Sequence, residues 1–161
     1  MLFRSHEVPF EVAAGYRRSV GVWLSSSMGV RLARLAVDIH WVTTWEHRAA
    51  SEIAPRCGLP RDLPVLTRVD HGEEWELAWK FLTVRRVIEQ DPKPFVWIDD
   101  DIDFLEDASL TPRDWADSIS VPSLLIAPYT RTGLLPRQLD TVDEFVRQHG
   151  GDSEVDETDN A

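Results

Sequence analysis

The feature that most constrains the fold is a set of short, uninterrupted apolar runs that alternate with helical patterns. Two of these runs, 95–98 and 123–127, contain no charged residue and are bounded by proline or aspartate. Continuous apolar runs are typical of strands buried on both faces, because strands with a solvent-facing side alternate apolar and polar residues. The pattern predicts an α/β fold, with a parallel sheet and helices on both faces, in which 39–42 is a third strand.

Helical patterns separate these runs and have apolar residues three or four positions apart. The helices are expected near 26–35, 45–57, 72–90, 111–119 and 135–149, and a further short strand is expected at 20–24. Thr111 and Pro112 form a typical helix start, because threonine caps the helix and proline suits its first turn. Gly150 is expected to end the last helix.

Composition limits the classes of protein that this sequence can encode. The 161 residues are enough for one domain, expected at 1–149, and the acidic segment 150–161 is expected to be disordered. The net charge of -11 argues against a nucleic-acid surface built on bulk positive charge. Cys57 is the only cysteine, so an intrachain disulfide cannot form. No apolar stretch approaches the length of a membrane span, and a cytoplasmic location is expected.

The run at 95–98 leads directly into a cluster of aspartates, of which Asp99, Asp100 and Asp103 are the candidate metal ligands. Carboxylates this close repel one another, and each costs free energy when it is buried without a partner. Mg²⁺ prefers oxygen ligands and needs only one or two carboxylates plus a substrate phosphate. The alternative is a solvated acidic turn. The clustering also predicts that at least one of these carboxyl groups has a raised pKa.

Two further residues are candidates for contact with phosphate. Thr43 lies where the predicted strand becomes a helix, and a helix N-terminus favours anions. The alternative for Thr43 is a capping box with Glu46. Lys80 lies between Trp79 and Phe81 on the longest helical pattern, where its ammonium group could neutralise phosphate charge. The alternative for Lys80 is a side chain that extends into solvent.

The order strand–Thr43, helix–Lys80, strand–Asp99–Asp100 resembles the second, third and fourth motifs of the haloacid dehalogenase-like (HAD) superfamily. The sequence is most similar to small bacterial HAD-like domains, some of them associated with RNA repair. The matching stretches, from about residue 22 to 146, are "TTWE", "GLP", "WK", "WIDD" and a late "GL". The resemblance implies a three-layer, Rossmann-like parallel sheet and Mg²⁺ chemistry on phosphate esters.

The resemblance also implies individual roles. Thr43 would hold phosphoryl oxygens, Lys80 would balance charge, and Asp99 and Asp100 would hold Mg²⁺, with Asp103 at the spacing of the fourth motif. The superfamily's first motif, an Asp-x-Asp at the end of a central first strand, is missing, because Asp38 is the only aspartate before Thr43. Either Met1 is internal to a longer protein or the chain has lost the nucleophile.

Two functions follow from this reading. The first is a Mg²⁺-dependent phosphohydrolase of HAD type that is incomplete as written, acting on a phosphorylated small molecule or a nucleic-acid end. The second is a non-catalytic HAD-like module that recognises a phosphorylated ligand. With half of its ligands missing, the site is expected to bind Mg²⁺ only weakly.

Overall fold

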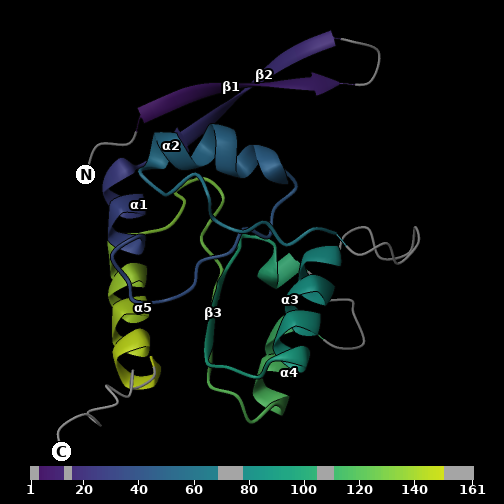
Figure 1. Cartoon of the computed structure of the whole chain (residues 1–161), viewed down its shortest axis with the longest axis vertical. Coiled ribbons are helices and arrows are strands. Elements are labelled where there is room, and N and C mark those ends of the chain that lie inside the picture. The colour runs from purple at the N-terminus through teal and green to yellow at the C-terminus, as the bar shows by residue number, and fades with distance from the viewer. Residues whose placement is uncertain (1–3, 13–15, 69–77, 105–110, 151–161) are drawn as a thin grey trace, which may run out of the picture.

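The computed structural model describes residues 4–12, 16–68, 78–104 and 111–150 (Figure 1). Two pairs of strands are present in this part of the chain: an antiparallel hairpin, β1 with β2, and a parallel pair, β3 with β4. The elements in order are β1 (Arg4–Val12), β2 (Tyr16–Leu24), α1 (Ser26–Leu32), a π-helical turn (Ala49–Ile53), α2 (Ala54–Cys57), α3 (Trp79–Gln90), β3 (Phe95–Ile98), a 3₁₀ turn (Ile102–Phe104), α4 (Pro112–Ser118), β4 (Ser123–Ile126) and α5 (Pro136–His149).

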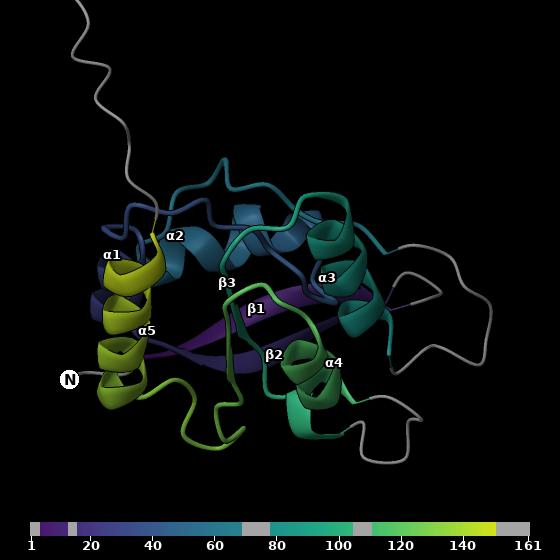
Figure 2. The same ribbon diagram turned by 90° about the horizontal axis from the view of Figure 1, so that it is seen from below.

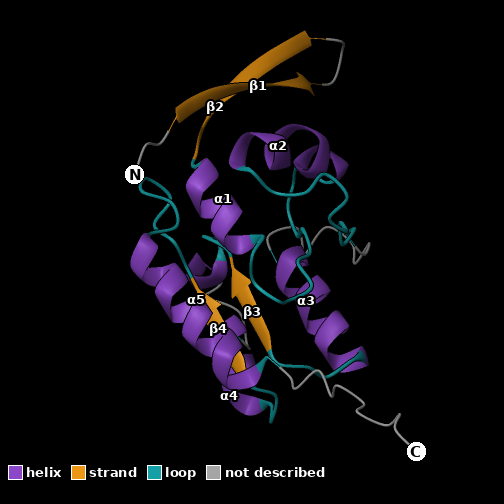
Figure 3. Ribbon diagram, turned by 60° about the vertical axis from the view of Figure 1, so that its left-hand side comes forward, coloured by secondary structure: helices purple, strands orange, loops and turns teal. Residues whose placement is uncertain are grey.

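The parallel pair β3–β4 lies at the centre of the body, between two sets of helices (Figures 1 and 3). Its register pairs Phe95 with Ser123 and Ile98 with Ile126. The prediction of a mixed α/β protein with parallel strands is therefore confirmed. The described part of this sheet has two strands.

One face of β3–β4 is covered by α3 and α4 through an aromatic cluster. Trp97 of β3 stacks on Phe81 of α3, with ring centroids 6.3 Å apart and an interplanar angle of 9°. Trp115 of α4 meets the edge of Phe81, with centroids 5.7 Å apart. All three residues are at most 6% exposed, so this cluster fixes α3 firmly against the strand.

The opposite face is covered by α1 and α5. Val96 and Ile98, which alternate with Trp97 along β3, pack against a buried cluster that contains Met28 of α1 and Leu139 of α5. A strand whose side chains alternate between two apolar clusters must be apolar throughout, which explains the unbroken run at 95–98. Figure 2 shows α1 and α5 on one side of β3 and α3 and α4 on the other.

The packing of α1 against α2 depends on a close approach at Gly29. A Cβ atom built on Gly29 would lie 1.8 Å from the carbonyl oxygen of Cys57, at the end of α2. The chain then leaves α2 through Gly58, whose φ of 79° is the left-handed conformation that favours glycine at a helix end. Two glycines therefore allow α2 to end directly over α1.

The predicted third strand at 39–42 is wrong. Trp41 makes a single parallel bridge with Val65, in which the Trp41 N–H donates to the carbonyl oxygen of Pro64 at 2.8 Å. No hydrogen bond joins 39–42 to β3 among the described residues. Proline lacks an N–H group, so Pro64 limits how far the bridge can extend into a ladder.

The segment 20–24 is a strand, but it does not belong to the parallel sheet. It is the second half of β2, which pairs antiparallel with β1 in a hairpin at one end of the molecule (Figure 1). The first strand of this hairpin, β1, was not predicted. Its sequence contains Pro9 and charged residues, which are not typical of a buried strand.

Most of the other predicted elements are found. Thr111 caps α4, because its hydroxyl accepts the Asp114 N–H at 3.1 Å, and Pro112 occupies the first turn. The helix predicted at 45–57 is present from 47 to 57, with its middle part, Ala49–Ile53, in the π-helical conformation and α2 as its end. The start of the helix predicted at 72–90 and the acidic tail after Gly150 lie outside the described residues. None of the described helices is long and apolar enough to cross a membrane.

Candidate functional site

Lys80 places its ammonium group among the aspartates that follow β3. The Lys80 Nζ atom donates to Asp99 Oδ1 at 3.0 Å and to Asp101 Oδ2 at 2.7 Å. The Lys80 side chain is 14% exposed and that of Asp99 is 8% exposed, whereas that of Asp101 is 50% exposed. Because the adjacent Phe81 is fixed in the aromatic core, the backbone of α3 holds Lys80 in this position. The chain therefore supplies its own cation to the acidic cluster.

Asp99 is held by both its backbone and its side chain. Its N–H donates to the carbonyl oxygen of Ile126 at 3.1 Å, which extends the pairing of β3 with β4 by one residue. Its Oδ1 atom accepts the N–H of Asp101 at 2.9 Å, a turn that aspartate commonly forms with the residue two positions on. These contacts orient the carboxylate of Asp99 toward Lys80.

The environment of this pair raises the pKa of both groups. Burial raises the pKa of the Asp99 carboxyl, and the hydrogen bonds from the Asp101 N–H and from Lys80 only partly offset this effect. Burial lowers the pKa of the Lys80 ammonium, but the hydrogen bonds to Asp101 and Asp99 outweigh it and the pKa is raised. A raised carboxyl pKa was expected from repulsion, but its main cause is burial, and the charge of Asp101 contributes least.

Three carboxylates lie close enough together to share a cation: Asp99, Asp100 and Asp101, with one oxygen of each within 4.8 Å of the others. Asp103, which was predicted as a ligand, is not in this group. The 3₁₀ turn buries Ile102, which is 2% exposed, and directs Asp103 to the guanidinium of Arg113, 2.7 Å away. The geometry thus brings together two of the three predicted metal ligands and replaces the third with Asp101.

Thr43 directly follows a segment that packs beside β3. Val42 contacts the buried cluster that contains Trp97 of β3. The charge of Asp38, at the start of this segment, makes a small contribution to the raised pKa of Lys93, which is caused mainly by the hydrogen bond from Lys93 to Asp91. The segment 38–42 therefore lies beside β3 and ends at Thr43.

The hydrogen bonds of Thr43 are local. Its hydroxyl accepts the N–H of Trp45 at 3.3 Å, and its carbonyl oxygen accepts the N–H of Glu46 at 3.0 Å. Glu46 has a φ of 49°, so this turn is tight and the π-helical turn begins only at Ala49. In the described structure no hydrogen bond joins the Thr43 hydroxyl to Lys80 or to the aspartates. The structure therefore gives Thr43 a local turn, and the capping box with Glu46 is not formed among the described residues.

The residues that could hold a hard cation are Asp99 and Asp100. Among the described residues, Asp100 forms no hydrogen bond and the Oδ2 atom of Asp99 has no hydrogen-bond partner, so these oxygens are available for a ligand. Carboxylate oxygens are the ligands that Mg²⁺ prefers, and Asp99 with Asp100 would be enough if a phosphate supplied further oxygens. Lys80 would then partly offset the charge of that phosphate.

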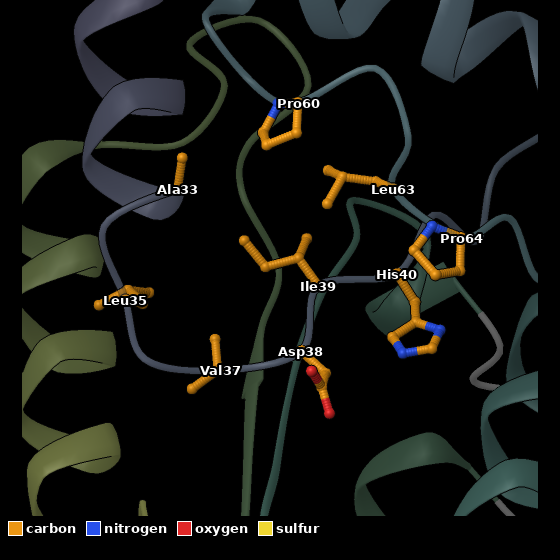
Figure 4. Close-up of a pocket in the computed structure, with 9 residues that line it drawn as sticks. All are labelled: Ala33, Leu35, Val37, Asp38, Ile39, His40, Pro60, Leu63 and Pro64. Carbon is orange, nitrogen blue, oxygen red and sulfur yellow. The ribbon is translucent and has the colours of Figure 1, made fainter.

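A separate pocket of about 260 Å³ lies away from this site (Figure 4). It is formed by the segments 33–40 and 60–64, and its lining is mostly apolar, with Asp38 and His40 as its polar members. None of the aspartates after β3 contributes to it. The candidate site is therefore an edge of the sheet and not the described pocket.

Sequence reasoning missed Asp101 because it selected Asp103 by motif spacing. The available signal was the Asp99-x-Asp101 spacing, which is typical of a turn closed by an aspartate side chain. Comparisons of the chain with protein-family models, with curated proteins and with solved structures found no match. Fold and site define a mixed α/β protein with a lysine–carboxylate cluster at the carboxyl end of a parallel strand pair.

Proposed function

We propose that the chain is a HAD-like domain of the phosphohydrolase type, which uses Mg²⁺ and acts on phosphate esters. The observation that supports this proposal best is the contact of Lys80 with Asp99 and Asp101 at the carboxyl end of β3. In open α/β sheets, ligands bind outside the carboxyl ends of the strands. The helices on both faces of β3–β4 agree with a three-layer, Rossmann-like architecture, to which the proposal assigns the fold.

In this proposal each residue has a limited and separate role. Asp99 and Asp100 would hold Mg²⁺, which supplies charge stabilisation to the phosphoryl group. Lys80 would keep its ion pair with Asp99 and turn its remaining donors toward a phosphate oxygen. Thr43, at the end of the segment beside β3, would donate its hydroxyl to another oxygen. The ligand would be a phosphorylated small molecule or a nucleic-acid end, in the cytoplasm.

A second candidate, a module that binds a phosphorylated ligand without hydrolysing it, is favoured by the position of Asp38. A phosphohydrolase of this type needs a carboxylate nucleophile close to the metal. Asp38 is the only aspartate before Thr43, and it lines the separate pocket formed by 33–40 and 60–64, to which none of the aspartates after β3 contributes. No described contact joins Asp38 to the cluster that would hold the metal.

The test measures binding and turnover on the same protein. Hydrolysis of p-nitrophenyl phosphate is followed with and without Mg²⁺, and binding of inorganic phosphate is followed by calorimetry. The variants are Asp99→Asn, which removes the buried carboxylate, and Asp103→Asn, a matched control on the exposed neighbour that pairs with Arg113.

The two candidates predict different results. Mg²⁺-dependent turnover that is lost in Asp99→Asn and kept in Asp103→Asn supports the hydrolase. Mg²⁺-dependent phosphate binding without turnover, with the same dependence on Asp99, supports the binding module. If wild type and Asp99→Asn neither bind nor hydrolyse differently, both proposals fail.

A further inference from the structure

The turn after β4 presents two large side chains at the edge of the sheet that carries the candidate site. The carbonyl oxygen of Tyr129 accepts the N–H groups of Thr132 at 2.9 Å and Gly133 at 2.8 Å, and Tyr129 and Gly133 form an antiparallel bridge. Gly133 has a φ of 63°, which glycine adopts at little cost. The turn is therefore closed by its own backbone and holds Arg131 at its tip.

Neither Tyr129 nor Arg131 contributes to the described core. Tyr129 is 66% exposed, although tyrosine usually buries its ring. Arg131 is exposed, and no ion pair joins it to another described residue, in a chain whose net charge is -11. An ordered turn that displays an aromatic ring and an unpaired guanidinium offers contacts to a ligand instead of contacts to the fold.

The position of the turn relates it to Asp99. The Asp99 N–H donates to the carbonyl oxygen of Ile126, so the segments that follow β3 and β4 leave the same edge of the sheet. Tyr129 is three residues beyond Ile126, a span of about 10 Å in extended chain. A ligand whose phosphate lies at Lys80 and Asp99 can therefore extend toward this turn.

We infer that Tyr129 and Arg131 bind the nucleoside part of a nucleoside phosphate, whose phosphate occupies the site proposed above. Any planar base can stack on a tyrosine ring, whichever of the bases it is. A guanidinium stacks on the base or pairs with a second phosphate. A sugar phosphate offers no aromatic ring that could stack on Tyr129. The inference rests on the proposed function for the position of the phosphate, and the nucleotide is either free or the end of a nucleic-acid strand.

The experiment compares four probes on the full chain in the presence of Mg²⁺: inorganic phosphate, ribose 5-phosphate, adenosine 5′-monophosphate and a 5′-phosphorylated deoxyadenosine hexamer. Calorimetry or chemical-shift titration gives each Kd. We expect the adenosine monophosphate to bind about tenfold more tightly than ribose 5-phosphate, the size of one base–aromatic stack. Tyr129→Ala should abolish this difference, and Tyr129→Phe should keep it.

The arginine has its own matched control. Arg131→Ala should weaken binding of the adenosine monophosphate several-fold. Arg147→Ala, which removes the same charge near the far end of α5, should leave binding unchanged. A hexamer that binds more tightly than the mononucleotide identifies a nucleic-acid end, and equal affinities identify a free nucleotide.

The outcomes separate this inference from the proposed function. If Tyr129→Ala keeps the ratio of the two affinities, the inference is overturned, whatever Asp99→Asn does. If the ratio depends on Tyr129 but Asp99→Asn changes nothing, a nucleoside site exists and the proposed function fails. Because Tyr129 is largely exposed, its substitution leaves the core intact, and unchanged circular dichroism of each variant verifies this.

Discussion

The ammonium nitrogen of Lys80 lies 3.0 Å from a carboxylate oxygen of Asp99, although 19 residues separate them in the chain and both side chains are largely buried. This contact joins α3 to the end of β3 and places a positive charge inside an acidic turn. Without it, the Asp99 carboxylate would be buried with only the N–H of Asp101 to stabilise it. The pair is thus both a stabilising contact and the centre of the proposed site.

Removal of the ammonium group should destabilise the protein strongly. Lys80→Met keeps the aliphatic length but leaves Asp99 buried without its cation, and we expect a loss of about 3 kcal/mol in the free energy of unfolding. Lys93→Met is the matched control, because Lys93 pairs with Asp91 at 2.7 Å on the surface, where both side chains are mostly exposed. That variant should change stability little, because solvent screens the exposed pair. Urea unfolding measures both, and equal losses would contradict the buried pair.

The contribution of Lys80 to stability should disappear at alkaline pH. Its pKa is raised in the folded protein above the ordinary value of 10.5, so the folded state holds the proton more tightly than the unfolded state. The contribution is therefore fully present below pH 10.5 and is lost as the pH rises through the folded pKa. The stability difference between wild type and Lys80→Met should be constant from pH 7 to about pH 10 and shrink above it.

Asp99 should act in the same sense as Lys80, but at acidic pH. Its folded pKa is raised above the ordinary value of 3.8, mainly by burial, so protonation relieves a cost that the charged form carries. This contribution favours the folded state increasingly as the pH falls through the folded pKa. A carboxyl-carbon NMR titration should give Asp99 a midpoint above 3.8, and a midpoint at or below that value would refute the assignment.

Mg²⁺ should bind the chain weakly, with a Kd of about 1 mM, because the described site offers carboxylates from one turn only. The thermal midpoint of the wild type should rise only slightly at a Mg²⁺ concentration of roughly 10 mM, which is about tenfold above this Kd. Asp100→Asn should stabilise the metal-free chain by removing repulsion, and it should abolish the Mg²⁺ response.

Asp103→Asn is the control for this titration. It removes an exposed pair with Arg113, so it should change stability little and leave the Mg²⁺ response intact. Differential scanning calorimetry of the three proteins is sufficient. A large Mg²⁺-induced rise for the wild type would mean that residues beyond this turn complete the site.

Substitution of two glycines by alanine should lower the stability of the protein for different reasons. Gly29→Ala would put a Cβ 1.8 Å from the backbone oxygen of Cys57, so α1 and α2 must separate, and we expect a loss of about 3 kcal/mol. Gly133→Ala has open space around its Cβ but a φ of 63°, so only backbone strain of about 1 kcal/mol is expected. Chemical denaturation of both variants checks the order, and the reverse order would contradict the close approach.

The sequence by itself determined the elements whose signals are local. The apolar run at 95–98 is a strand because both of its faces are buried, and α4 begins at Thr111 because a hydroxyl and a proline suit a helix start. The elements need only neighbouring residues and their periodicity. That Lys80 and Asp99 belong to one site came instead from the order of the motifs, which resembles that of the HAD superfamily.

The tertiary structure alone decided which segments pair and which carboxylates meet. The run at 39–42 is as apolar as a buried strand, yet its backbone bonds to Pro64 and Leu66 and not to β3. Asp101 meets Lys80 while Asp103 meets Arg113, because the buried Ile102 sets the direction of the turn between them. Local sequence does not encode such choices, since strand partners and ion pairs depend on the relative free energies of contacts between distant residues.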